Sequence, residues 1–278
     1  MILRVFPRRT KATPEDEYAT TEYPGLFMPE NVEEVHVSCA FTYDLDKAYD
    51  LAEAWSKYYP VKIGGPAFNK PGGEFTPGMY LKEGYVITSR GCPNNCWFCA
   101  VPKRERNGLQ ELEIKEGWNV LDDNLLACSE GHIRAVFDML KRQKHKARFT
   151  GGLEAKRLKE WHCELLRGLK LDRIYFAYDT PDDYEPLREA SRMLKGNGLL
   201  SLRKVGVYCL CGYPSDTQEK AEHRFMEVLK LGMQPYAMLW RDKDGITLEE
   251  WRKFQRLWVA PQIIYTRLKS MQNGEIER

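Results

Sequence analysis

Three cysteines lie within eight residues of this chain, in the segment Cys92-Pro-Asn-Asn-Cys96-Trp-Phe-Cys99. Iron–sulfur clusters are held by Cys thiolates, and a [4Fe–4S] cube has iron at four of its corners. Three closely spaced thiolates on one loop can hold three of these irons. The fourth iron then has no protein ligand and is open to a small molecule. The spacing C-x3-C-x2-C therefore indicates an iron–sulfur cluster with one open coordination position.

Zinc binding and disulfide formation explain this segment less well. Zinc sites usually join two Cys pairs, or a Cys pair to a His pair, whereas this chain has a single Cys group with no His nearby. The eight cysteines are an even number, but the chain is long and three of them are too tightly clustered to bridge one another. We therefore expect a reducing, cytoplasmic environment without a disulfide framework.

The segment resembles the signature of the radical S-adenosylmethionine (SAM) superfamily, in which an aromatic residue precedes the third Cys, as Phe98 does here. The resemblance implies that Cys92, Cys96 and Cys99 bind one [4Fe–4S] cluster and that Phe98 lies near the adenine of SAM. It also implies that the open iron chelates the amino and carboxylate groups of SAM. An electron from an external flavodoxin- or ferredoxin-like donor then cleaves SAM to a 5′-deoxyadenosyl radical.

The bulk composition is that of a soluble globular protein. The 278 residues are 43% hydrophobic and 29% charged, and this length suits one large domain or one domain with an appendage. The net charge of +2 produces no strong field toward nucleic acid or membrane. No apolar run is long enough for a signal peptide or a membrane span. We therefore expect no membrane partner, and nucleic acid is not indicated.

The front of the chain predicts a small β-α-β unit. Residues 1–30 contain four prolines with mixed charges and predict an irregular arm. Strands are expected over residues 35–41 and 61–65, with a helix over 45–59 whose apolar residues share one face. A β-α-β connection makes the two strands parallel. Residues 66–80 are rich in Pro and Gly and predict a linker.

From Tyr85 onward, predicted strands alternate with helices. The strands are expected over residues 85–90, 118–121, 147–150, 173–178, 204–210 and 235–240. This alternation predicts an α/β fold with a parallel sheet curled into a partial barrel. The resemblance implies an open, TIM-like (β/α)6 barrel.

The expected domains follow from these strands. They are an N-terminal arm and truncated Rossmann-like segment over 1–80, the barrel over 81–245, and a helical tail over 246–278. The tail should be helical from Trp251 to Arg267, should be broken at Pro261, and should cover the barrel.

Two segments compete for the amino group of SAM, which the superfamily usually holds at the end of the second strand. Gly151-Gly152-Leu153-Glu154 looks like the family's Gly-Gly-Glu segment, but it follows the third predicted strand. The second-strand position is occupied by Asp122, Asp123 and Asn124, and a similar Asp-Asp-Asn stretch occurs in cobalamin-type radical SAM enzymes. We therefore assign the amino-group contact to Asp122–Asn124. The alternative is a loop of helix-capping residues.

Further cofactor contacts are expected at the ends of later strands. Glu154 either contacts SAM or substrate, or caps its helix. Asp179 ends the fourth strand, where the family commonly contacts the SAM ribose, although Asp179-Thr180 also begins a good turn-and-cap sequence. The segment around Gly212 resembles the family's fifth strand, where glycine lets the backbone approach the adenosine.

Cys209 and Cys211 lie on the same face of the fifth predicted strand, because side chains alternate. If that face lines the barrel, either thiol could donate a hydrogen atom to a substrate radical; otherwise they are core residues. The remaining cysteines are scattered, so a single cluster is expected. They are Cys39, Cys128 and Cys163.

The segment Val35–Gly65 resembles the last β-α-β part of a cobalamin-binding domain. The Asp-x-His-x-x-Gly loop that supplies a His to cobalt in such domains does not occur in this sequence. We therefore expect a vestigial domain without cobalamin. Methyl transfer through methylcobalamin and methylthio transfer are alternatives that this departure disfavours. A non-catalytic iron–sulfur or regulatory protein is the other alternative.

Overall fold

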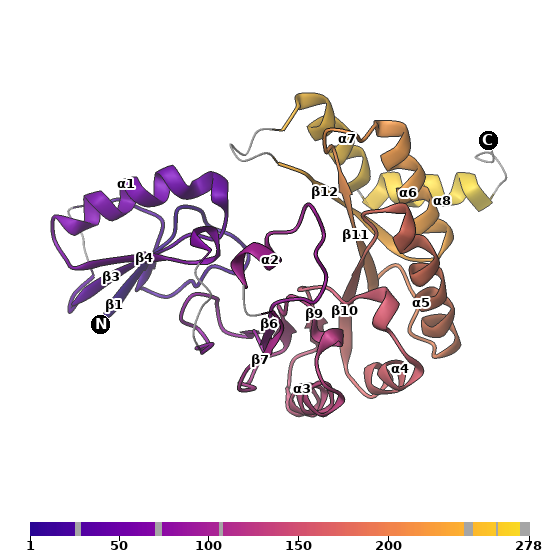
Figure 1. Cartoon of the computed structure of the whole chain (residues 1–278), viewed down its shortest axis with the longest axis horizontal. Helices are drawn as coiled ribbons and strands as arrows, with labels where there is room; N and C mark the ends of the chain where they lie inside the picture. The colour runs from indigo at the N-terminus through magenta and orange to yellow at the C-terminus, as the bar shows by residue number, and fades with distance from the viewer. Residues whose placement is uncertain (26–28, 70–73, 106–107, 242–246, 260, 273–278) are drawn as a thin grey trace. The chain divides into compact units, whose positions relative to one another are not determined.

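The computed structural model describes the chain except residues 26–28, 70–73, 106–107, 242–246, 260 and 273–278. It is an α/β protein whose contacts divide it into two units, Met1–Ala147 and Arg148–Arg278 (Figure 1). The predicted α/β class with parallel strands is confirmed. The domain boundaries expected at residues 80 and 245 stay predictions.

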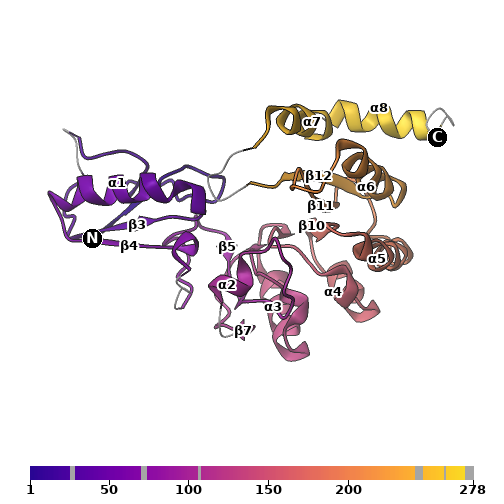
Figure 2. The same cartoon turned by 45° about the horizontal axis from the view of Figure 1, so that its top comes forward.

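A parallel sheet of four strands begins the N-terminal unit, in the order β2-β1-β3-β4. Helix α1 (Leu45–Ser56) lies along one face of this sheet in both views (Figures 1 and 2). The strands are β1 (Ile2–Val5), β2 (Ala19–Thr20), β3 (Glu34–Ser38) and β4 (Val61–Gly64).

The core of this sheet explains why the irregular arm predicted over residues 1–30 is wrong. Leu3 and Val5 are completely buried and face α1 together with Val35 and Val37 of β3. β1 pairs with β3 along its whole length, from Ile2 opposite Glu34 to Val5 opposite Val37. The first proline follows β1, so the strand is complete before the chain turns. The apolar alternation of this short strand is the signal that the proline content obscures.

The predicted strand over 85–90 is two short strands with different partners. β5 (Tyr85–Val86) pairs in parallel with β8 (Asn119–Val120), whereas β6 (Ser89–Arg90) pairs antiparallel with β7 (Gln110–Glu111). The ladder is interrupted at Thr88, whose backbone N–H donates to the Asp122 carboxylate. The other elements of this unit are α2 (Val101–Arg104), α3 (Glu130–Arg142) and the first residue of β9 (Ala147–Phe149).

The C-terminal unit contains three long, parallel, neighbouring strands, β10 (Leu171–Ala177), β11 (Val205–Cys211) and β12 (Gln234–Leu239). They lie side by side in both views (Figures 1 and 2). Helix α6 packs on β11 and β12, and α7 packs on β12. The helices are α4 (Glu160–Arg167), α5 (Tyr184–Gly196), α6 (Gln218–Lys230), α7 (Glu249–Val259) and α8 (Pro261–Gln272).

The larger sheet has the strand order β12-β11-β10-β9-β8-β5, so its strands follow chain order, while β6 and β7 form a separate two-stranded antiparallel sheet. The expected tail is helical: α7 ends at Val259 and α8 begins at Pro261, because proline suits the first position of a helix.

In the described part of the chain, no helix is both long enough and apolar enough to cross a membrane.

Candidate functional site

The cysteine loop leaves the end of β6 through a glycine that no other residue can replace without strain. Gly91 has a φ of 85°, and a Cβ at this position would collide with the carbonyl group of Gly108. Positive φ and close backbone approach are the two conditions that glycine meets most readily. Within the loop, Cys99 N–H donates to the Cys96 carbonyl over 3.0 Å. The backbone thus turns sharply just before α2.

N–H groups donate hydrogen bonds to the sulfurs of Cys92 and Cys99. Cys92 Sγ accepts from the Asn124 side chain at 3.3 Å and from the Asn94 N–H at 3.5 Å, and Cys99 Sγ accepts from the Val101 N–H at 3.5 Å. Burial raises the pKa of the Cys99 thiol, and the nearby Cys92 raises it further. Hydrogen bonds to sulfur are one of the factors that set cluster potentials.

The third sulfur belongs to Cys96, which is exposed, whereas Cys92 and Cys99 are half-buried. Within the described ranges, the side chains bring together no group of three His, Cys, Asp or Glu residues suited to a metal ion. The donor chemistry fits an iron–sulfur cluster, because three thiols stand on one anchored loop. Binding a cluster therefore requires the three thiols to come closer together than they are in this structure.

Asp122 anchors the strand that precedes the loop. Asp122 is 1% exposed. Its carboxylate accepts hydrogen bonds from Thr88 N at 2.6 Å, Thr88 Oγ1 at 2.5 Å and Ser89 Oγ at 2.8 Å. Burial raises the pKa of Asp122, while these hydrogen bonds oppose the rise. Both oxygens are therefore engaged by the β5–β6 junction, which indicates that Asp122 acts as a positioning residue.

Asp123 anchors the base of the loop itself. Its Oδ2 accepts from Gly91 N–H at 2.9 Å, and its Oδ1 forms an ion pair with Arg104 at 2.6 Å. Arg104 stands at the end of α2 and also pairs with the buried Glu105 at 2.8 Å. Asp123 therefore joins the residue before Cys92 to the helix after Cys99.

The three predicted residues Asp122, Asp123 and Asn124 contact successive residues of the stretch that ends at Cys92. Asp122 holds Thr88 and Ser89, Asp123 holds Gly91, and Asn124 holds Cys92. Phe98 is half-buried and packs edge-on against the exposed Trp97, with ring centroids 5.3 Å apart.

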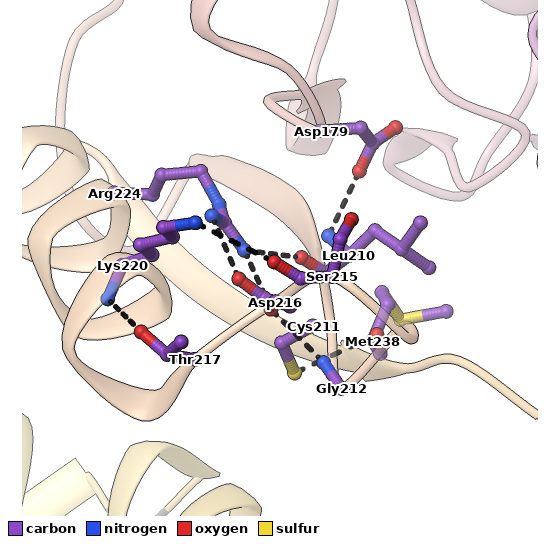
Figure 3. A network of polar contacts seen from close by, with 10 residues as sticks. All are labelled: Asp179, Leu210, Cys211, Gly212, Ser215, Asp216, Thr217, Lys220, Arg224 and Met238. Atoms are coloured by element: carbon purple, nitrogen blue, oxygen red, sulfur yellow. Dashed lines mark hydrogen bonds and ion pairs between the residues drawn. The ribbon is translucent and has the colours of Figure 1, made fainter.

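A second group of predicted residues forms a polar network in the C-terminal unit (Figure 3). Asp179 Oδ1 accepts from Leu210 N–H at 2.8 Å, and Gly212 N–H donates to Asp216 Oδ2 at 3.0 Å. Burial raises the pKa of Asp179 to about 6, and the neighbouring Asp183 contributes to the rise. The network thus cross-links the ends of β10 and β11 through side chains.

Gly212 has a φ of 79°, and a Cβ there would lie 3.0 Å from the Trp251 ring. Its carboxylate partner Asp216 has no exposed side-chain surface and is paired with Arg224 of α6 at 3.0 Å. Arg224 also donates to the Leu210 carbonyl at 2.9 Å. Glu154, which follows β9, accepts from Arg157 Nε through its Oε2 at 2.5 Å.

Cys209 and Cys211 are both completely buried. They alternate with Gly206, Tyr208 and Leu210 along β11 and lie on the face that carries Val205 and Val207. Burial raises the pKa of Cys209 well above its usual range and that of Cys211 to about 12. Their surroundings are those of core thiols, which disfavours hydrogen-atom donation to a substrate.

Several residues that hold these sites carry no signal in the sequence. Thr88, Ser89 and Arg104 lie close to the cysteine motif, but their partners Asp122 and Asp123 follow β8 and are more than 15 residues away in the sequence. Arg224 has the periodicity of an ordinary helix residue, and only its burial against Asp216 distinguishes it.

No model of a known protein family matches this chain. No curated protein matches it either.

Proposed function

We propose that this chain is a radical SAM enzyme whose single [4Fe–4S] cluster is held by Cys92, Cys96 and Cys99. The observation that carries the proposal is the C-x3-C-x2-C loop with Phe98 before its third Cys. The anchoring of this loop by Asp123 and Asn124 supports it. When bound and reduced, such a cluster together with SAM supplies a 5′-deoxyadenosyl radical, which takes a hydrogen atom from an organic substrate.

The chain's own residues fix the position and the surroundings of the thiolates. Asn124 holds Cys92 and donates to its sulfur, while Asp123 and Arg104 clamp the two ends of the loop. The exposed Cys96 completes the set when the loop closes on iron. Asp122 positions Thr88 and Ser89 through its hydrogen bonds. The amino group of SAM is assigned to the segment Asp122–Asn124.

By the resemblance to the superfamily, we assign the other contacts to SAM to residues that follow later strands. The six-stranded sheet is proposed to curl into a partial (β/α)6 barrel, since the carboxyl ends of parallel strands gather functional loops. Asp179 accepts from the ribose hydroxyls, Gly212 allows close backbone approach to the adenosine, and Glu154 faces SAM or substrate.

The proposal also specifies the redox setting. A reducing cytoplasm keeps the three thiols available for iron, and a flavodoxin- or ferredoxin-like protein supplies the electron. Cobalamin takes no part, because the sequence lacks the loop that would provide its His ligand.

Anaerobic reconstitution with iron and sulfide tests the proposal. The full chain should gain the broad visible absorbance of a [4Fe–4S] cluster, and dithionite with SAM should yield 5′-deoxyadenosine and methionine. Cys92→Ala, Cys96→Ala and Cys99→Ala should each abolish the full cluster, whereas Cys163→Ala, which removes a buried thiol of α4, should retain it. A stable cluster that never cleaves SAM would overturn the enzyme assignment in favour of a non-catalytic iron–sulfur protein.

A further inference from the structure

The N-terminal unit contains a pocket of about 470 Å³ to which the proposed function assigns no ligand. All of its lining residues belong to this unit, between Phe6 and Leu121. Its rim includes the residues that follow three parallel strands: Phe6 to Arg8 after β1, Ala40 and Phe41 after β3, and Gly65 and Pro66 after β4. A volume of this size is typical of sites for small organic molecules.

The topology of the first sheet places the pocket where such sheets bind ligands. From β1 the chain goes to β2 on one side, and it then returns to β3 and β4 on the other side. The order β2-β1-β3-β4 therefore has its switch point between β1 and β3. Ligands of open α/β sheets bind outside the carboxyl ends of the strands at this point, as in flavodoxin-like folds.

The backbone at the rim is packed closely and leaves no room for a side chain. Gly65 has a φ of 109°, and a Cβ there would lie 2.5 Å from the Cys39 carbonyl oxygen. Cys39 N–H donates to the Gly64 carbonyl, and the Cys39 carbonyl accepts from Ala67 N–H, at 2.9 and 3.1 Å. The pocket is therefore bounded on this side by hydrogen-bonded backbone.

The walls are mainly apolar, with aromatic side chains from separate segments. Phe6, Phe41 and Phe75 contribute rings, and Val37, Ile87 and Leu121 are among the aliphatic residues. Burying an apolar ring system against such walls is favourable. The walls alone favour a ligand with an apolar, ring-containing body.

The positively charged residues that line the pocket indicate which charge the ligand carries. Three of them have a carboxylate within 2.7 Å: Arg8 pairs with Asp44, Lys62 with Glu34, and Arg104 with Asp123. For Arg90 the nearest ion-pair contact among the described residues is longer, 3.9 Å to Glu105.

The Arg90 side chain is 17% exposed, and in the described part of the chain its buried Nε has no hydrogen-bond partner. A buried donor without a partner is costly, whereas guanidinium groups bind oxyanions strongly.

We propose that this pocket binds a small organic anion with an apolar ring system as its body and an oxyanion head group at Arg90. The proposal goes beyond the radical SAM function and does not depend on the cluster. The rings contact Phe6, Phe41 and Phe75, and the head group satisfies the guanidinium. The site therefore discriminates by charge between molecules of equal shape.

Two fluorescent probes test the pocket on the purified full chain with its iron content measured. 8-Anilino-1-naphthalenesulfonate has three aromatic rings and a sulfonate, and N-phenyl-1-naphthylamine has the same rings without charge. The sulfonate should bind saturably with one molecule per chain, and the neutral amine about tenfold more weakly. Equal affinities, or fluorescence that does not saturate, would overturn the proposal.

Variants separate the head-group contact from the cavity. Arg90→Gln should weaken the sulfonate about tenfold and leave the neutral amine unchanged, whereas Arg90→Lys should restore part of the difference. Ser38→Trp, which fills the pocket from the end of β3, should remove binding of both probes. Arg134→Gln on α3, where Arg134 pairs with Glu130, is the matched control and should bind like the natural chain.

Circular dichroism confirms that each variant is folded. If Ser38→Trp does not fold, the two variants Arg90→Gln and Arg90→Lys alone test whether the pocket binds the sulfonate. Unchanged sulfonate affinity in Arg90→Gln, or full binding in a folded Ser38→Trp chain, refutes the site.

Discussion

The side-chain amide of Asn124 donates to the sulfur of Cys92 over 3.3 Å, across 32 residues of sequence. This contact joins the end of the second predicted barrel strand to the first proposed cluster ligand. Asn124 is 4% exposed, so the hydrogen bond lies away from solvent. A donor in such a position stabilises negative charge on the sulfur.

Removing this donor should make the cluster harder to reduce. In Asn124→Leu the sulfur loses an N–H partner, and fewer hydrogen bonds to sulfur shift cluster potentials downward. We expect a cluster that still assembles but has a more negative midpoint potential, measured by a redox titration followed by EPR. Asn197→Leu, at the end of α5, is the control. An unchanged potential in Asn124→Leu would contradict the role of this contact.

Asp122 should contribute mainly to stability. Asp122→Ala leaves the backbone N–H and hydroxyl of Thr88 and the hydroxyl of Ser89 without their shared acceptor. Each unsatisfied buried donor costs about 1–3 kcal/mol, so we expect a loss of at least about 3 kcal/mol in urea denaturation. Asp138→Ala, at an exposed position of α3, should change stability by less than about 0.5 kcal/mol. Similar losses in the two variants would rule out the anchoring role.

The carboxyl group of Asp179 should make stability fall as the pH rises. Its pKa is raised from 3.8 to about 6 in the folded chain, so the folded state binds the proton more tightly than the unfolded state. The protonated form therefore stabilises the fold below about pH 4, and this contribution is lost as the pH rises to about 6.

Asp179→Asn should match the natural chain near pH 4 and exceed its stability near pH 7 by up to about 3 kcal/mol. The measurement is urea denaturation at both pH values, with Asp182→Asn at an exposed position as control. The same difference at both pH values would show that Asp179 does not titrate as described.

The buried ion pair between Asp216 and Arg224 should be costly to break on one side only. Arg224→Leu leaves Asp216, whose side chain has no exposed surface, without its cation. Breaking a buried pair in this way typically costs about 3–5 kcal/mol. The double variant Arg224→Leu/Asp216→Leu should lose less than the sum of the single losses, because no charge is left buried. Arg188→Leu, an exposed arginine of α5, is the control, and strict additivity would contradict the coupling.

Thiol reactivity should separate the cysteine loop from the core. In the iron-free chain, Ellman's reagent should react fastest with the exposed Cys96 and slowest with Cys209 and Cys211. Both core thiols are completely buried, and burial raises their pKa values, so little thiolate forms. Cys96→Ala should remove the fast phase, while Cys211→Ala should leave it intact. Rapid labelling of Cys211 in the folded chain would place that thiol at an accessible surface instead.

The sequence predicts local patterns well and long-range partners poorly. The buried face of α1 follows from its periodicity, and Ala48, Leu51 and Trp55 are buried as the spacing predicts. Strand β1 escapes prediction because four residues are too few to outweigh the prolines that follow them. For α7 the same periodicity predicts one apolar face of Trp251, Phe254, Leu257 and Trp258. Three of these residues are buried, but Leu257 is 46% exposed.

The candidate site shows the same limit. The cysteine spacing and the Asp-Asp-Asn segment are visible in the sequence, but their hydrogen bonds depend on how two distant strands pair. Sequence periodicity does not show that both carboxylate oxygens of Asp122 accept hydrogen bonds from Thr88 and Ser89. For Cys209 and Cys211, alternation shows that they share a face, but the covering helix α6 decides which face that is.

The sequential contacts of Asp122, Asp123 and Asn124 have a consequence for chain length. Each of the three side chains reaches a successive part of the stretch from Thr88 to Cys92. A one-residue insertion or deletion in either stretch would displace all three pairings together. Beyond Cys92, Asp123 also pairs with Arg104 at the end of α2. The number of residues at the entry to the loop is therefore constrained as a whole, because one insertion or deletion would break three contacts at once.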